Sequence, residues 1–221
     1  TPLPWPAVYA FLGLQEVLLI GMPAYLLYKR TDESRARLGG SLALPDSLRA
    51  GLTSMAAISY TLASLIVIGM WYSILQSAGV TLPTEVDTIV PKGGAQLAVA
   101  LLAAAIIPAV CEELFFRGIL FDWLHRKWGE RWAAWVSSIL FAGLHFSLLG
   151  FASLMVIGLL LAGLRRRYGG IVLPMLFHAL DNAAVLLLNS LNANPSPQTA
   201  MLCFGIFIAV VYVLFRKERT A

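Results

Sequence analysis

The stretch AQLAVALLAAAIIPAVCEELFFRGILFDW, residues 95–123, decides the fold of this chain. It is longer than the ~20 apolar residues that a helix needs to cross a bilayer, and its apolar residues do not alternate with polar ones as they would in a strand. The charged residues Glu112, Glu113 and Arg117 lie inside this run. We therefore expect a membrane-spanning helix that carries ionisable groups within its apolar region.

The composition of the whole chain extends this interpretation. Of its 221 residues, 59% are hydrophobic and 13% are charged, and the mean hydropathy is +0.78. A soluble domain is about 45–50% apolar and about 25% charged, so a soluble fold of this size could not bury so much apolar surface. A bilayer accepts that surface because it replaces water as the solvent. The sequence thus indicates a single integral membrane domain over residues 1–221.

Six more apolar runs flank the stretch at 95–123, and polar or turn-rich segments separate them. These runs are too long for buried strands and lack a period of two, so helices are favoured. The fold class that we expect is all-α, a polytopic transmembrane helix bundle with about seven spans and a range of six to eight. The six additional runs cover residues 5–28, 48–75, 132–149, 151–164, 171–191 and 199–215.

Basic residues cluster after every second run, at 29–37, 125–131, 165–167 and 216–219. Alternating spans place all four clusters on one side of the membrane, which the positive-inside rule identifies as cytoplasmic. We therefore expect the N-terminus outside and the C-terminus in the cytoplasm. Contact with the lipid bilayer's headgroups accounts for the net charge of +4. No stacking platform or Gly-rich basic stretch accompanies the clusters, so no nucleic-acid partner is expected.

The charged residues of the third run fall into two groups. Glu113 and Arg117 are four residues apart, so they share one face of the helix and can pair. Pairing allows both charges to exist in an apolar setting. Glu112 is turned about 100° away and has no obvious partner on its own helix. A carboxylate left free in a poorly solvated site suits a general base, so we expect Glu112 to be available for chemistry.

Two later runs carry polar residues at helical spacing. Phe141 and His145 are four apart in one run, and His178 and Asn182 are four apart in another. A lone membrane histidine is often only an interhelical hydrogen-bonding group. Together with Glu112, however, these residues supply a base, a proton carrier and oxyanion donors, the parts needed to activate water against a carbonyl. We favour a functional site on these grounds.

Two other acidic residues in the runs are interpreted as packing groups. Asp181 is turned away from the face of His178, so we expect it to bond to a neighbouring helix. Glu16 lies in the first run, where either a site role or a packing contact fits its position. We favour the packing contact for Glu16.

Three motifs carry a resemblance to a known family. Residues 112–117, EELFFR, match EExxxR; residues 141–145, FAGLH, match FxxxH; and residues 178–182, HALDN, match HxxxN. In this order, each in an apolar helix, they resemble the CPBP intramembrane proteases. That family comprises the CAAX prenyl endopeptidases and their bacteriocin-processing or immunity (Abi) relatives. The motif-bearing core runs from about residue 95 to residue 191.

The resemblance implies a role for each motif residue. The implied function is an intramembrane endopeptidase that hydrolyses a membrane-associated peptide or protein substrate, in a prokaryotic cytoplasmic membrane. Glu112 would activate the water and His145 would help to hold it, while the oxyanion would be stabilised by His178 and Asn182. Structural support is expected from Glu113, Arg117 and Phe141.

Metal dependence is a separate question. Two histidines and a glutamate could ligate zinc. However, HExxH is absent, and Asn182 supplies an amide, which is a poor zinc ligand and a good oxyanion donor. We expect no metal and no cofactor, with a zinc-dependent version of the same protease as the alternative.

Two functions from other classes stay open. One is a non-catalytic membrane factor, such as a bacteriocin-immunity protein or an assembly partner. The other is a transporter that uses the buried Glu and His residues as a proton relay. A transporter favours half-helix breaks or inverted repeats, and the sequence shows neither. The sequence implies no particular oligomeric state.

Overall fold

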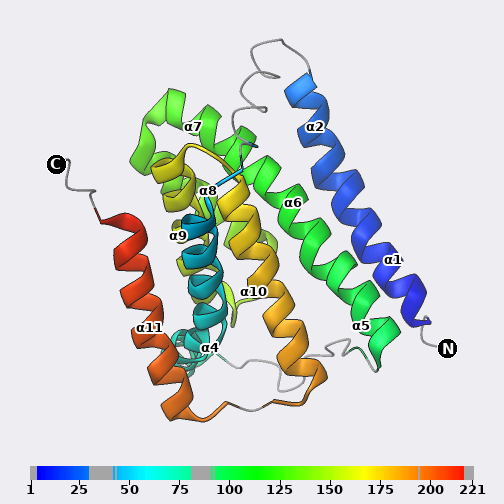
Figure 1. Cartoon of the computed structure of the whole chain (residues 1–221), viewed down its shortest axis with the longest axis vertical. Helices are drawn as coiled ribbons and strands as arrows, with labels where there is room; N and C mark the ends of the chain where they lie inside the picture. The colour runs from blue at the N-terminus through cyan, green and yellow to red at the C-terminus, as the bar shows by residue number, and fades with distance from the viewer. Residues whose placement is uncertain are drawn as a thin grey trace.

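Seven helical rods form the part of the chain that the computed structural model describes, which is residues 4–29, 42, 44–80, 91, 93–193 and 195–216 (Figure 1). No strand occurs among these residues. The rods coincide with the seven apolar runs, because each run is long enough to satisfy its backbone hydrogen bonds internally as a helix. The predicted all-α membrane bundle is confirmed.

Two rods contain short π-helical segments, written η, and the other rods are single helices. The first rod joins α1 (Trp5–Glu16), η1 (Val17–Gly21) and α2 (Met22–Lys29). The third rod joins α5 (Gly94–Leu101), η2 (Leu102–Ile106), α6 (Ile107–Glu113), η3 (Leu114–Leu120) and α7 (Phe121–Trp128). The single helices are α4 (Ser47–Ser77), α8 (Glu130–Leu144), α9 (Phe151–Tyr168), α10 (Val172–Ser190) and α11 (Pro197–Phe215).

Five of the described rods are long and apolar enough to cross a membrane. They are Trp5–Lys29, Ser47–Ser77, Gly94–Trp128, Val172–Ser190 and Pro197–Phe215. The predicted fourth and fifth spans, α8 and α9, are helices of the bundle outside this group. With 15 residues, α8 covers about 22 Å, less than the ~30 Å hydrocarbon core. The last turn of α9 carries Arg165, Arg166 and Arg167.

The fourth run differs from its predicted form at its C-terminal end. Hydropathy extends the run to Leu149, but the helix ends at Leu144 and the chain then turns. Phe146 adopts a positive φ of 48°, which an α-helix cannot accommodate. The turn includes the apolar residues Phe146, Leu148 and Leu149, so the hydropathy of the run does not reveal it. It is held to α4 by the indole of Trp71, whose Nε1 donates to the carbonyl oxygen of Leu148 at 2.7 Å.

The core lies where the central rods meet, and small residues let the helices approach closely. A Cβ on Gly158 of α9 would lie only 3.2 Å from the Cα of Ser138 on α8. The hydroxyl of Tyr60 on α4 donates to the carbonyl oxygen of Ser153 on α9 at 2.6 Å. The buried core includes Tyr60, Phe116, Phe141, Leu161, Phe177 and Leu214, from six different elements.

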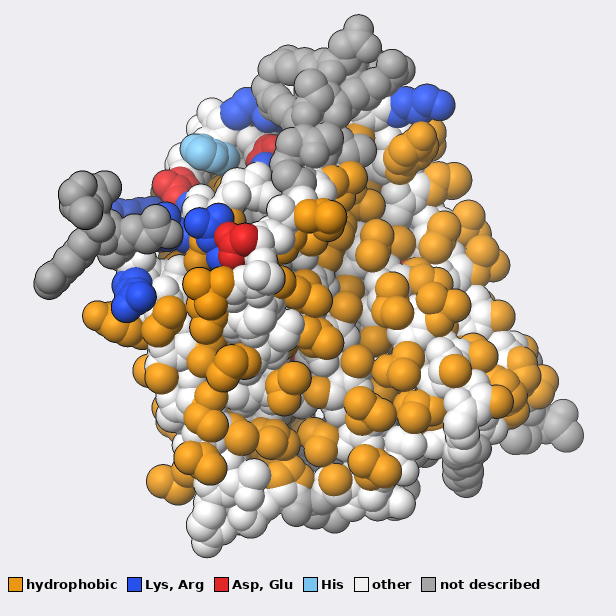
Figure 2. Space-filling model, in the orientation of Figure 1, with side chains coloured by type: hydrophobic (Ala, Val, Ile, Leu, Met, Phe, Trp, Pro, Cys, Tyr) orange, Lys and Arg blue, Asp and Glu red, His pale blue; other side chains and the backbone are white. Residues whose placement is uncertain are grey.

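The described parts of the basic clusters gather at one end of the bundle (Figure 2). Arg165 pairs with Asp122 at 3.0 Å, and Arg166 pairs with Glu130 at 2.9 Å. The guanidinium of Arg167 donates to the carbonyl oxygen of Arg216 at 3.4 Å. These contacts agree with the prediction that the basic clusters lie on one side of the membrane. Residues 30–37 and 217–219 of the clusters lie outside the described residues, and which face is cytoplasmic stays a prediction.

Candidate active site

The two motif glutamates end the helix α6, immediately before the π-helical segment η3. A π-helical turn contains an extra residue, so the side chains after it are rotated relative to those of a regular helix. Such segments are rare and are found frequently at functional sites. Sequence reasoning treated the third run as one regular helix and therefore missed this feature.

Glu113 and Arg117 form the predicted ion pair, which is confirmed. Arg117 Nη1 lies 2.9 Å from Glu113 Oε1, and both side chains are fully buried. Arg117 Nη2 donates to the carbonyl oxygen of Gly158 at 3.1 Å, so the pair also ties the third rod to α9. Because both side chains are buried away from water, the charge of each residue is compensated mainly by the charge of the other. The sequence did not indicate that Glu113 Oε1 also lies 3.1 Å from Nδ1 of His178.

Phe141 stands at the centre of the three motifs. The Arg117 guanidinium carbon lies 4.5 Å from the centroid of its ring, a cation–π contact. The ring centroids of His145 and His178 lie 4.9 Å and 5.5 Å from that of Phe141. Phe141 is fully buried, so its ring is held in place and packs against the imidazole rings of both histidines. This placement agrees with the predicted supporting role of Phe141, which remains untested.

His145 follows the last residue of α8 and folds back onto that helix. Its Nδ1 lies 2.8 Å from the backbone carbonyl oxygen of Phe141. A carbonyl oxygen can only accept, so Nδ1 carries the hydrogen and Nε2 of the neutral ring carries the lone pair. The contact therefore fixes the tautomer and leaves Nε2 available.

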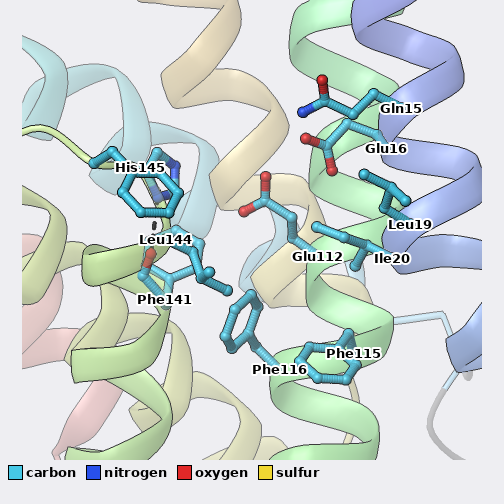
Figure 3. A pocket seen from close by; sticks show the side chains of 11 residues that line it. Gln15, Glu16, Leu19, Ile20, Glu112, Phe115, Phe116, Phe141, Leu144 and His145 are labelled. Carbon is cyan, nitrogen blue, oxygen red and sulfur yellow. Dashed lines mark hydrogen bonds between the residues drawn. The ribbon is translucent and has the colours of Figure 1, made fainter.

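Glu112 and His145 line one cavity of about 520 Å³ (Figure 3). Glu112 is only 7% exposed, and its Oε2 is buried with no hydrogen-bond partner among the described residues. The cavity is otherwise mostly apolar, which is typical of a ligand site with a few placed polar groups. Its walls are formed by Gln15, Glu16, Leu19, Ile20, Glu112, Phe115, Phe116, Phe141, Leu144, His145 and Phe146.

The other two predicted catalytic residues lie on α10, outside the described cavity lining. His178 is buried and lies close enough to interact electrostatically with Glu112. Asn182 is half-buried, one helical turn beyond His178. The structure thus brings Glu112, His145 and Phe141 to one cavity and places His178 behind Phe141, against Glu113.

The two remaining acidic residues have different surroundings. Asp181 accepts a hydrogen bond from Thr61 of α4 at 2.7 Å, so the predicted bond to a neighbouring helix is confirmed. Glu16, for which a packing contact was favoured, lines the same cavity as Glu112 and lies on the same side of it, away from His145 (Figure 3). The signal that could have found it is an unpaired ionisable residue inside a predicted span.

A metal centre would depend on which donor atoms of the site can ligate an ion together. Among the described residues, no group of three or more His, Cys, Asp or Glu side chains is arranged to hold a metal ion. His145 and His178 each direct Nδ1 to a protein acceptor, which leaves Nε2 of each ring free of that contact, as in metal-ligating histidines. Metal independence nevertheless stays a prediction.

A family model matches the segment that contains all three motifs. Residues 94–184 match the family described as type II CAAX prenyl endopeptidase Rce1-like. The match spans α5 to most of α10 and leaves the first rod, α4 and α11 outside it. No curated protein and no solved structure matches the chain. The match confirms the resemblance carried by the motifs: residues 94–184 of this chain are similar to the type II CAAX prenyl endopeptidases of the CPBP family.

Proposed function

We propose that the chain is an intramembrane endopeptidase that hydrolyses a peptide bond with a water activated by Glu112. One observation carries this proposal. The Glu112 carboxylate is almost completely buried, its inner oxygen lacks a partner among the described residues, and it lines the same cavity as His145. A buried acceptor without a donor is unfavourable, so its retention beside a histidine favours a chemical role.

The proposed reaction begins with a water between Glu112 and His145. Glu112 takes a proton from the water, and the lone pair on Nε2 of His145 holds it by accepting a hydrogen bond. The water oxygen then attacks the carbonyl carbon of the scissile bond. Phe141 supports this step through its backbone, since its carbonyl oxygen fixes the orientation of the His145 ring.

The proposed oxyanion donors are His178 and Asn182. Nδ1 of His178 is engaged with Glu113, so Nε2 can donate only when the ring carries both protons. The Glu113 carboxylate supplies the counter-charge for that form. Neither His178 nor Asn182 lines the described cavity, so this part of the proposal requires the bound substrate to widen the cavity toward α10.

The proposal extends to the class of substrate and to the membrane in which the chain lies. The substrate is a peptide or protein at the membrane, and the membrane is a prokaryotic cytoplasmic one with the basic end of the bundle inside. Prenylation of the substrate is one possibility within the family description. The proposed chemistry uses no metal, and a zinc-dependent reaction is the alternative.

The test compares fragments of membrane proteins made by wild-type and Glu112→Gln chains reconstituted in native lipid vesicles. New protein termini should form with the wild-type chain and be at least ~10²-fold less abundant with the variant. Glu130→Gln is the matched control, because Glu130 is a half-exposed carboxylate in a salt bridge at the basic end. Equal fragment yields from the wild-type and Glu112→Gln chains would contradict the proposal.

A non-catalytic membrane partner is the second candidate function. The observation in its favour is that His178 and Asn182 lie outside the described lining of the Glu112 cavity. A partner protein would need the bundle but not the carboxylate of Glu112. It would therefore keep its biological effect in Glu112→Gln cells, whereas a protease would lose it.

A further inference from the structure

A second carboxylate lines the cavity on the same side as Glu112, away from His145 (Figure 3). Glu16 is the last residue of α1 and is half-buried. Its Oε2 is buried and, like Oε2 of Glu112, has no hydrogen-bond partner in the described part of the chain. Apart from Gln15 and His145, the rest of the described lining is apolar. Two carboxylates that line one cavity and each have a buried oxygen without a hydrogen-bond donor indicate a place where a proton, a water or a substrate group supplies the missing donor.

Close helix packing on both sides of Glu16 fixes this arrangement. One turn before it, a Cβ on Gly13 would lie 3.5 Å from the Cβ of Ala103 on the third rod. Five residues after it, a Cβ on Gly21 would lie 2.6 Å from Sγ of Cys111, the residue before Glu112. A side chain at position 21 would thus have to displace the Cys111 thiol. The first rod is therefore held against α6 at the level of the two carboxylates.

The electrostatics of the pair favour unequal protonation. Glu16 lies close enough to Glu112 to interact with it electrostatically. Two negative charges beside a mostly apolar cavity repel each other, so such a pair is most stable when it holds one proton. One member is then a base and the other is an acid. Burial favours the neutral form of Glu112, and His178 acts electrostatically on both carboxylates, so Glu112 is taken as the base because the proposed reaction uses it to activate the water.

We infer that Glu16 is a further catalytic residue, the general acid that protonates the leaving amine. This inference rests on the proposed function. Glu112 takes one proton from the water as the water oxygen bonds to the carbonyl carbon. The carbon–nitrogen bond then breaks, and the nitrogen receives the proton of Glu16. The products are a carboxylic acid and an amine, and transfer of the proton from Glu112 to Glu16 through water restores the pair.

The family match assigns no role to Glu16, since the matched segment begins at residue 94. The inference also gives the first rod a function, because that rod lies outside the three motifs. A site built only from the motif residues would use Glu112 for both proton transfers. The two possibilities differ in how the reaction depends on the leaving group.

The test uses that difference. A peptide that the wild-type chain cleaves in lipid vesicles is selected from a synthetic membrane-anchored library and is then prepared with an amide or a thioester at the scissile bond. A thiolate can leave without first being protonated. The nitrogen of an amide must receive a proton before it leaves as an amine. Glu16→Gln should lower kcat for the amide by about 10²–10⁴-fold and leave kcat for the thioester within about threefold of wild type. Glu16→Asp should recover part of the amide activity.

Each other outcome has a distinct meaning. Equal losses on amide and thioester, or an unchanged amide rate in Glu16→Gln, would overturn the role of Glu16 while leaving the proposed function intact, provided that Glu112→Gln loses both activities. Undiminished cleavage by Glu112→Gln, or no cleavage of any peptide by the wild-type chain, would overturn the proposed function and this inference with it. The melting temperature of Glu16→Gln separates misfolding from a chemical effect, and Glu130→Gln is the carboxylate control.

Discussion

Nδ1 of His178 lies 3.1 Å from Oε1 of Glu113, the oxygen that also accepts a hydrogen bond from Arg117 at 2.9 Å. One buried oxygen therefore joins α10 to the third rod. The carboxylate compensates the Arg117 charge and at the same time orients the His178 ring. Glu113 is thus both a structural residue and a positioning residue for a proposed oxyanion donor.

Replacing Glu113 should destabilise the fold. Glu113→Gln removes the carboxylate that contacts the buried Arg117 charge, which costs about 3–5 kcal/mol in free energy of unfolding. Denaturant unfolding in detergent micelles measures this change. Glu112→Gln is the matched control and should leave the free energy of unfolding unchanged or raise it, because Oε2 of Glu112 has no partner among the described residues. Similar losses in both variants would contradict the division into a structural and a chemical glutamate.

Replacing Phe141 should impair activity more than stability. Phe141→Leu keeps an apolar side chain but removes the ring that contacts Arg117, His145 and His178. A small displacement of a catalytic group can lower the rate by about 10²-fold. Peptide cleavage and the melting temperature are measured together. Phe207→Leu is the control, because that buried ring packs on Tyr60 of α4 and should affect only stability.

Surface labelling should place the basic clusters together. In a background without Cys111 and Cys203, cysteines at Arg166 and Arg216 should react with a membrane-impermeant maleimide only after spheroplasts are permeabilised. A cysteine at Asn192, which follows α10, should react in intact spheroplasts. Labelling of the positions 166 and 216 from different sides would contradict the alternating topology.

The purified chain should retain activity without zinc. The proposed chemistry needs only a carboxylate, a water and hydrogen-bond donors, so we expect far less than one zinc ion per chain by elemental analysis and no loss of cleavage after chelation. One tightly bound zinc per chain, removable only with loss of activity, would identify a metalloprotease instead.

The sequence by itself determined the helices and the local pairs. Seven apolar runs predicted seven helical rods, because a long apolar segment in a bilayer must satisfy its backbone within one helix. The contact between Glu113 and Arg117 was also predictable, since residues four apart in a helix are neighbours whatever surrounds them. The same helical geometry predicted that Glu112 points away from the face shared by Glu113 and Arg117.

The tertiary structure alone decided which distant groups meet. The contact of Glu113 with His178 joins residues 65 positions apart. Glu16 lines the Glu112 cavity because the first rod packs closely on the third rod, at Gly13 and Gly21. The end of α8 at Leu144 likewise depends on a turn that includes the apolar residues Phe146, Leu148 and Leu149. Helical spacing fixes neighbours within about one turn, whereas contacts between helices depend on side-chain packing that no local pattern in the sequence encodes.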